Sequence, residues 1–367
     1  MPTNKTDKPR VAIVHDWLIG GGAERVVMEL HNMYPDAPIY TSYCSSAWRQ
    51  KLDNKVVTGW LQYWPFSKLR KFIPFLRIWW FTRLRFDDFD LVISSSGAEA
   101  KGIRTPANVV HINYCHAPTH YYWNRYNDYL KNPGFGIFNG LARFGLKTLV
   151  EPLRRWDYRA AQRPNYMIAN STFTQDEIKK YYGRDSVVVH PPIDTERFSS
   201  SSPERHGFVI TGRQTPYKRV DLAVKACTDL SLDLTVIGKG PDHRRLQSLA
   251  GPTITFLTGV SDVELASHLS AAQAFIFPGV DDFGIAAVEA MAAGTPIVAY
   301  KAGGALDYVI NGETGRFFEE QSVESLSKVL AGFRSGDFNS AHIRQAATAF
   351  STKAFQKSMF AIINKLV

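Results

Sequence analysis

The sequence predicts an α/β protein made of two Rossmann-like, doubly wound domains. Short apolar runs alternate with longer amphipathic segments, as strands and helices do around parallel sheets. The alternation stops at a polar, proline-marked linker and then restarts, and 367 residues suffice for two such domains. We therefore expect one domain over residues 1–190, a second over 191–350, and a helix over 351–367 that packs back on the first.

Composition narrows the function classes. No apolar run reaches the roughly 20 residues that span a bilayer, and the first ten residues lack the apolar core of a signal peptide. The three cysteines are scattered and show no disulfide or zinc-binding spacing. These features predict a cytoplasmic protein.

Charge is concentrated in the first half. Residues 1–190 contain 26 lysines and arginines against 16 acids, whereas residues 191–367 contain 17 against 18. This asymmetry predicts an anionic partner for the first half, either a nucleic acid or a membrane surface.

Five apolar runs of the first half predict buried strands, at residues 10–15, 89–94, 108–113, 166–169 and 186–189. Gly20, Gly21 and Gly22 lie between the first strand and a helix that begins near Ala23, so the backbone can approach a ligand closely there. A tight turn explains these glycines equally well. They do not form the G-x-G-x-x-G pattern of a dinucleotide site.

His116 follows the third of these strands, in the sequence Tyr-Cys-His-Ala-Pro. Ligands of open parallel sheets bind beyond the carboxyl ends of strands, so His116 is a candidate site residue. A purely structural role for this histidine is equally expected.

Residues 63–86 combine six basic and several aromatic residues and contain no acid. This composition favours contact with an anionic membrane surface. Two alternatives remain open: the aromatic side chains belong to the core, or they stack on single-stranded nucleic acid.

The linker is polar and proline-marked at residues 190–192 and 199–203. Beyond it, predicted strands lie at residues 207–211, 232–237, 253–257, 274–277 and 297–300, with helices between them. We expect a further helical segment over residues 341–366.

Two acids stand eight positions apart after the fourth strand of this half. Asp281 lies in the loop, and Glu289 lies inside the helix that Phe283, Gly284 and Ile285 lead into. A helix N-terminus suits a phosphorylated ligand, and nearby acids can accept hydrogen bonds from sugar or ribose hydroxyls. An ordinary crossover with solvated acids is the simpler alternative.

Arg213 and Lys218 follow the first strand of the second half. An arginine can bind a diphosphate with two hydrogen bonds, and a lysine can add a point charge. With the two acids they predict a nucleotide-sugar pocket. No D-x-D metal motif follows the end of a predicted strand, so Arg213, Lys218 and helix dipoles would neutralise the leaving diphosphate in place of a metal.

These motifs resemble those of the GT4 family of retaining glycosyltransferases, which have the GT-B fold. The resemblance rests on Gly20-Gly21-Gly22, on residues 114–118, on Gly212-Arg213 with Lys218–Leu222, on residues 281–294, and on Gly303-Gly304. One position departs from the pattern, because Asp281 stands where the family's motif has its first glutamate. The resemblance implies two domains that face a cleft.

By this resemblance, the catalytic residues would be Arg213, Lys218, His116 and Asp281. The donor-binding residues would be Gly21, Gly22, Gly212, Arg213, Lys218, Asp281, Phe283, Gly284, Ile285 and Glu289. No metal ligand and no cofactor are expected, and no side chain is assigned as the general base.

The loop sequence is most similar to bacterial mannosyltransferases that extend polyprenyl-diphosphate-linked glycans. This implies transfer of a hexose to a lipid-linked acceptor at the inner face of the cell membrane. The best candidate for the donor is GDP-mannose, which would supply mannose, and a UDP-sugar remains an open alternative. A nucleotide-sugar epimerase is the first alternative, and it would need acid/base pairs at the sugar. A nucleic-acid-binding protein is less favoured, because no such motif is found.

Overall fold

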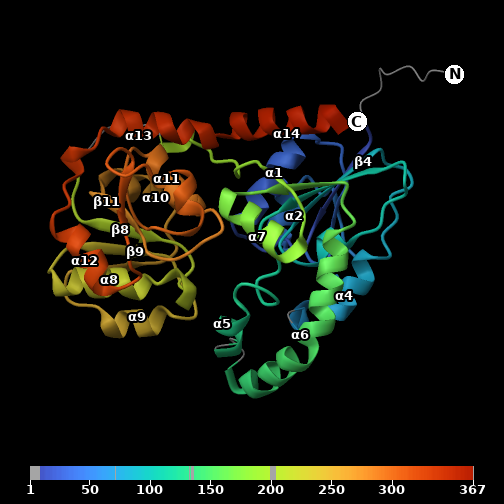
Figure 1. Ribbon diagram of the computed structural model, residues 1–367, viewed down its shortest axis with the longest axis horizontal. Helices are drawn as coiled ribbons and strands as arrows, with labels where there is room; N and C mark the ends of the chain where they lie inside the picture. The colour runs from blue at the N-terminus through green and yellow to red at the C-terminus, as the bar shows by residue number, and fades with distance from the viewer. Residues whose placement is uncertain (1–8, 71, 132, 134–135, 199–203, 367) are drawn as a thin grey trace. The chain divides into compact units, whose positions relative to one another are not determined.

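The computed structural model describes residues 9–70, 72–131, 133, 136–198 and 204–366. Lys71 and the linker residues 199–203 therefore lie outside the described part. The chain divides into two units. The N-terminal unit contains Met1–His190 and Gln356–Val367, and the C-terminal unit contains Pro191–Phe355. Figure 1 shows helices packed around the sheet of each unit.

The N-terminal unit contains a parallel sheet with the strand order β3-β2-β1-β4-β5-β6-β7. Its strands are β1 (Val11–His15), β2 (Ile39–Thr41), β3 (Val56–Val57), β4 (Leu91–Ser96), β5 (Val110–Cys115), β6 (Tyr166–Ala169) and β7 (Val187–Val188). Such strands read as continuous apolar runs because helices cover both faces of the sheet. The strand order reverses between β1 and β4, which makes that point the expected ligand site.

The helices of this unit are α1 (Ala23–Met33), α2 (Ser46–Lys51), α3 (Phe66–Leu69), α4 (Pro74–Phe81), α5 (Tyr126–Lys131), α6 (Asn139–Ala161) and α7 (Thr172–Tyr182). Ser171 caps α7, since its Oγ accepts a hydrogen bond from the Thr174 N–H at 3.0 Å. A short 3-10 helix, η2 (Glu99–Gly102), follows β4. Residues after Phe355 join this unit: Gln356 donates to Glu29, and the ring of Phe360 lies 6.2 Å from that of Tyr34.

The C-terminal unit contains a second parallel sheet, in the order β10-β9-β8-β11-β12-β13. Its strands are β8 (Phe208–Thr211), β9 (Leu234–Ile237), β10 (Ile254–Leu257), β11 (Ala274–Phe277), β12 (Ile297–Tyr300) and β13 (Gly315–Phe318). The helices are α8 (Val220–Asp229), α9 (His243–Leu249), α10 (Asp262–Ala271), α11 (Ile285–Ala292), α12 (Val323–Ala331), α13 (Ser340–Ala347) and α14 (Thr352–Leu366), the last of which continues into the other unit. Figure 1 shows α10, α11 and α13 on one face of the sheet and α8, α9 and α12 on the other. The predicted pair of doubly wound parallel sheets is confirmed.

Two local expectations were wrong. Tyr114 and Cys115 belong to strand β5 rather than to the loop after it. The tail over residues 341–366 is two helices, because the backbone between them pairs with Ile193. The Ile193 N–H donates to the Phe350 carbonyl at 2.9 Å, and the Thr352 N–H donates to the Ile193 carbonyl at 3.1 Å.

The basic and aromatic stretch over residues 63–86 divides between surface and core. Trp80, Phe81 and Phe86 are buried in a core cluster of the N-terminal unit. Arg77, one of the six basic residues of this stretch, is 2% exposed and its Nη2 lies 2.6 Å from Glu99 Oε1, so it belongs to the buried part. Several large side chains are exposed: Tyr63, Trp64, Leu69, Phe72, Phe75 and Trp79.

Candidate functional site

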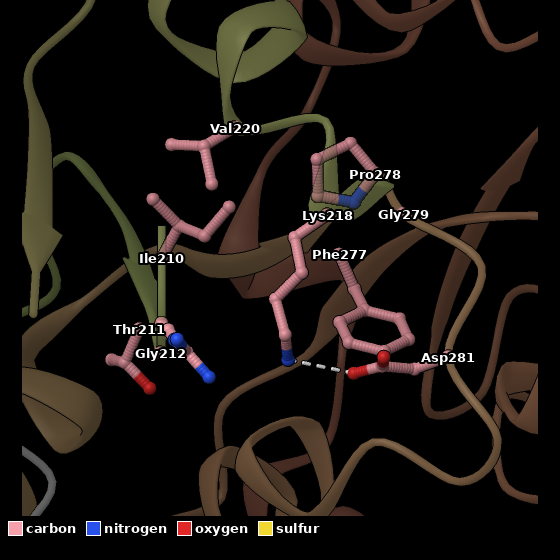
Figure 2. A pocket seen from close by; sticks show the side chains of 10 residues that line it. Ile210, Thr211, Gly212, Lys218, Val220, Phe277, Pro278, Gly279 and Asp281 are labelled. Atoms are coloured by element: carbon pink, nitrogen blue, oxygen red, sulfur yellow. Dashed lines mark hydrogen bonds and ion pairs between the residues drawn. The ribbon is translucent and has the colours of Figure 1, made fainter. Parts of the chain in front are cut away.

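The carboxyl ends of β8 and β11 form a pocket in the C-terminal unit, where the strand order of that sheet reverses. We call it the Lys218 pocket. It is lined by Ile210, Thr211, Gly212, Arg213, Lys218, Val220, Phe277, Pro278, Gly279 and Asp281 (Figure 2). The loop after β8 and the loop after β11 thus place Arg213, Lys218 and Asp281 around one space.

Lys218 and Asp281 form an ion pair across this pocket. The Lys218 Nζ lies 2.7 Å from the Asp281 Oδ2, and neither side chain is fully buried (Figure 2). Gly279 permits the close approach of the two loops, because a Cβ at that position would lie only 2.7 Å from the Lys218 Cα. The pair therefore presents a positive and a negative group side by side at the pocket wall.

Arg213 supplies a second cation. Its side chain is exposed, and it makes no hydrogen bond or ion pair from its side chain with any residue of the described part. The preceding Gly212 has φ +131°, a backbone conformation that favours glycine. Arg213 and Lys218 together can bind a doubly charged anion such as a diphosphate.

Phe283, Gly284 and Ile285 lead into α11 beside this pocket. Gly284 has φ +95° and occupies the N-cap position, so α11 begins directly after it. The Phe283 side chain is buried and packs against Tyr308 and Phe350. Phe283 can therefore offer a ligand only its backbone, and the N–H groups at the start of α11 are the polar feature here.

Glu289 is not among the residues that line the Lys218 pocket. It is 3% exposed, and its Oε1 lies 2.8 Å from Arg197 Nη2. Arg197 also contacts Asp262 at 3.1 Å. Arg197, which the sequence analysis did not single out, thus holds the Glu289 carboxylate in an ion pair.

A second pocket lies in the N-terminal unit at the carboxyl ends of β1 and β4, again where the strand order reverses. We call it the His116 pocket. Its lining residues are His15, Asp16, Trp17, Ala23, Glu24, Gly97, Ala98, His116 and Tyr121. The structure therefore places His116 in a pocket at the carboxyl edge of this sheet, where ligands of parallel sheets commonly bind.

Ser95 joins two histidines at this pocket. The His116 Nε2 lies 2.7 Å from the Ser95 Oγ, and the His15 Nδ1 lies 2.7 Å from the Ser95 carbonyl oxygen. The two imidazole rings meet edge to face, with centroids 6.1 Å apart. Both rings are thus oriented by one residue of β4.

Gly21 and Gly22 are exposed and do not line the His116 pocket. A Cβ on Gly21 would lie 3.0 Å from Glu24 Oε2, so the glycine loop passes directly over this carboxylate. Glu24 itself was missed in the sequence. The signal was present, because only Ala23 separates Glu24 from the last glycine, and Glu24 lies in the first turn of α1.

Buried charged side chains fix the loop after β4, which supplies Gly97 and Ala98 to the wall of the His116 pocket. Asp16 accepts hydrogen bonds from the backbone N–H groups of Gly97, Ala98 and Ala100 at 2.7–2.9 Å. Lys101 lies 2.6 Å from Asp157, and both side chains are fully buried. Burial acts to lower the pKa of Lys101, but the adjacent carboxylate outweighs it and raises that pKa above its ordinary value.

Among the described residues, no group of three or more His, Cys, Asp or Glu side chains is arranged to hold a metal ion.

Comparisons with known proteins cover nearly the whole chain. Residues 20–197 match the family model described as "Glycosyltransferase Family 4", and residues 192–349 match "Glycosyl transferases group 1". Similar curated proteins include a GDP-mannose-dependent alpha-(1-6)-phosphatidylinositol monomannoside mannosyltransferase of Mycolicibacterium smegmatis, 28% identical over 44% of this chain and 50% of that protein. A D-inositol 3-phosphate glycosyltransferase of Pseudarthrobacter chlorophenolicus is 30% identical over 45% of this chain and 47% of that protein. The chain thus matches about half the length of these curated relatives.

Solved structures share the fold along nearly the full length. HepE of Anabaena, solved with UDP and glucose, has a TM-score of 0.69 at 16% identity and covers 97% of this chain and 100% of its own. Sucrose-phosphate synthase of Thermosynechococcus elongatus has a TM-score of 0.70 at 17% identity, covering 98% and 99%. At such identities the likeness establishes the fold alone.

Proposed function

Because the chain belongs to glycosyltransferase family 4, we propose that it moves a hexose from a nucleotide sugar to a lipid-linked glycan at a membrane surface. The observation that carries this proposal is the Lys218 pocket, which brings Arg213, Lys218 and Asp281 together at the reversal point of the sheet. Two cations suit a departing diphosphate, and a carboxylate suits a sugar hydroxyl.

In the proposed reaction the bond between the anomeric carbon and the diphosphate oxygen breaks, and the acceptor hydroxyl oxygen bonds to that carbon. Arg213 and Lys218 stabilise the negative charge that develops on the leaving diphosphate. Asp281, whose Oδ2 lies 2.7 Å from Lys218 Nζ, holds the lysine at the pocket wall and accepts a hydrogen bond from a sugar hydroxyl. His116 contacts the transferred sugar in this proposal.

We propose that the reaction retains the configuration of the anomeric carbon and needs no metal. Attack comes from the face that the diphosphate leaves, and a donor phosphate oxygen takes the acceptor's proton. The backbone of Gly21 and Gly22 approaches the donor, and Glu289 accepts hydrogen bonds from the ribose. To bind the ribose, the Glu289 carboxylate must either contact Arg197 and the ribose at the same time or release Arg197.

GDP-mannose is the proposed donor. The mannosyltransferase of Mycolicibacterium smegmatis, whose name includes this donor, supports the choice. HepE was solved with UDP and glucose, so UDP-sugars belong in the same assay.

The proposed acceptor is a polyprenyl-diphosphate-linked glycan, reached at the inner face of the cell membrane. The exposed aromatic side chains Trp64, Phe72 and Trp79 support this, together with exposed Lys68 and Arg83 close to them in sequence. In the part of the chain that the structure describes, no helix is both long and apolar enough to cross a bilayer. Membrane contact in this proposal is therefore made by a surface of the N-terminal unit.

The epimerase alternative is not favoured, because both matching families and the quoted curated relatives are transferases.

The decisive experiment measures nucleotide release from GDP-mannose and a panel of UDP-sugars, with and without a polyprenyl-diphosphate sugar acceptor. Each reaction is repeated with EDTA. We expect acceptor-dependent release of one nucleotide that EDTA does not abolish. Release without an acceptor, or no release from any donor, would contradict the proposal, and loss of activity in EDTA would contradict its metal independence.

A further inference from the structure

The two halves of α6 differ in burial. The second half packs on the N-terminal unit through its buried residues Val150, Leu153, Asp157, Ala160 and Ala161. None of the described side chains over residues 139–149 is buried. Figure 1 shows this first half of α6, together with α5, projecting from the rest of the N-terminal unit. We call residues 138–149 the α6 arm.

The α6 arm presents an apolar face. Leu141, Phe144 and Leu149 occupy positions i, i+3 and i+8 of one helix, so they share a side of it. Leu141 is 70% exposed and Phe144 is 67% exposed, and Phe138, directly before the helix, is exposed as well. Neighbouring large apolar side chains that remain exposed indicate an interaction surface.

The α6 arm is a helix although its own sequence favours one only weakly. Gly145 lies inside it, and glycine is the least favourable helix residue after proline. A Cβ at this position would meet no atom within 4 Å outside the nearby helix backbone, so close packing does not explain the glycine. Short helices depend on burial of an apolar face, which the arm lacks within the described chain.

The charges around the α6 arm are complementary to an anionic surface. Residues 129–150 contain Lys131, Arg143 and Lys147 and no acid, and all three cations are exposed. Arg143 and Lys147 lie two and six positions after Leu141, which places them away from the apolar face. A helix with one apolar and one basic face is typical of the interface of an anionic bilayer.

A second copy of this chain fits the same charges less well. In a two-fold dimer the same patch of each copy meets the other. The basic residues beside the arm would then approach one another without an acid of residues 129–150 to pair with them. A bilayer that contains anionic lipids accepts both the apolar and the basic side chains.

From these observations we infer that the α6 arm lies in the surface of an anionic bilayer and inserts Phe138, Leu141, Phe144 and Leu149 among the lipids. This site is separate in sequence from the contact proposed for residues 63–86. The inference rests on the proposed function, because it gives the N-terminal unit a second contact with the surface that carries a lipid-linked acceptor.

The base of the arm lies next to the His116 pocket. The ring of Tyr129, on α5, lies 6.0 Å from the ring of Tyr121, which lines that pocket. Arg154, on the second half of α6, donates from its Nε to the Tyr122 carbonyl oxygen at 2.6 Å. Insertion of the arm therefore keeps the wall of the pocket close to the lipid surface.

The first test measures co-sedimentation of the full-length chain with vesicles of phosphatidylcholine and phosphatidylglycerol. Neither donor nor acceptor is present, so a failure of sugar transfer and a failure of this inference are separate results. Leu141→Asn combined with Phe144→Asn should weaken vesicle binding about tenfold or more, because two apolar side chains no longer enter the lipid. Vesicles of phosphatidylcholine alone should bind the native chain more weakly than the anionic vesicles do.

The matched control is Val263→Asn combined with Ile310→Asn. Both residues are exposed and apolar but belong to the C-terminal unit, so vesicle binding should not change. Because the four side chains that are changed in the two variants are exposed, both variants should keep the Tm of the native chain.

A second test leaves the apolar face intact. Thr148→Cys places a thiol on the arm, and the three native cysteines are buried, so an environment-sensitive fluorophore such as NBD labels the new thiol selectively. Its emission should shift to the blue when anionic vesicles are added. Ser248→Cys, exposed on α9 of the C-terminal unit, is the control and should show no shift.

Three results would each overturn the inference. The first is equal vesicle binding by the Leu141/Phe144 variant and the native chain, or equal binding of the native chain to neutral and anionic vesicles. The second is an unchanged emission from the label at position 148. The third is a dimer in sedimentation velocity that the Leu141/Phe144 variant alone loses, since the arm would then be an interface between two copies of the chain.

Discussion

The Lys218 Nζ lies 2.7 Å from the Asp281 Oδ2, which joins two loops that are 63 positions apart in the sequence. The aspartate holds the lysine at the pocket wall and partly neutralises it. A diphosphate entering the pocket would therefore compete with Asp281 for Lys218. As negative charge develops on the leaving diphosphate, its hydrogen bonds with Lys218 would become stronger.

Replacing Lys218 by alanine should lower kcat about 10²–10³-fold, because one preorganised cation that faces the leaving diphosphate is lost. The measurement is nucleotide release under saturating donor and acceptor. Lys225→Ala serves as control, since Lys225 is exposed on the neighbouring helix α8 and does not line the pocket. Near-native turnover of a folded Lys218→Ala chain would remove this residue from the mechanism.

Replacing Glu289 by alanine should raise the KM for the donor about tenfold or more, because a charged acceptor for the ribose hydroxyls is lost. Arg197→Ala separates this role from a structural one, since it breaks the 2.8 Å ion pair but leaves the carboxylate. If the pair only stabilises the fold, both variants will lower Tm and leave the donor KM unchanged. That result would refute ribose binding by Glu289.

Changing Lys68, Arg70 and Lys71 together to glutamate should release the chain from anionic liposomes. Each basic residue near such a surface contributes about 1 kcal/mol, so three reversals should weaken binding about a hundredfold or more. Co-sedimentation with phosphatidylserine vesicles measures the effect.

The control for this variant is the triple change of Lys225, Arg244 and Arg334 to glutamate. All three are exposed in the C-terminal unit, so this variant changes the net charge by the same amount as the first one but leaves residues 63–86 intact. Persistent co-sedimentation of the first variant, or equal loss in both, would show that residues 63–86 are not the membrane contact.

Acidification should destabilise the fold through His111. Burial lowers the pKa of this buried imidazole from 6.5 to about 3. Between these values the unfolded chain binds a proton that the folded chain does not, so the free energy of unfolding falls by up to about 1.4 kcal/mol per pH unit as pH drops below 6.5. Urea unfolding at pH 7, 6 and 5 measures this slope.

His111→Gln should flatten that slope, whereas His206→Gln should not, because His206 is exposed. Equal slopes for His111→Gln and the native chain would show that another group controls acid stability.

The two sheets could be predicted from sequence because buried parallel strands appear as uninterrupted apolar runs, as in Val11–His15 and Ala274–Phe277. The strand β2 (Ile39–Thr41) and the edge strand β3 (Val56–Val57) were not predicted, since runs of three and two residues carry no detectable period.

The candidate site was predictable only where its residues belong to a local motif. Arg213, Lys218 and Asp281 follow strand ends, and this position can be recognised in sequence. Pairing partners cannot be recognised in that way. The sequence does not reveal that Arg77 is buried, because charged side chains are usually exposed and nothing near Arg77 in the sequence points to Glu99.

The division of the chain has a consequence for synthesis on the ribosome. The N-terminal unit ends at His190 and resumes at Gln356, so its α14 residues are translated only after the whole C-terminal unit. The C-terminal unit, in contrast, is one continuous segment of the chain. Until then Glu29 and Tyr34 lack their partners Gln356 and Phe360, so the N-terminal unit is completed only after the C-terminal unit has been synthesised.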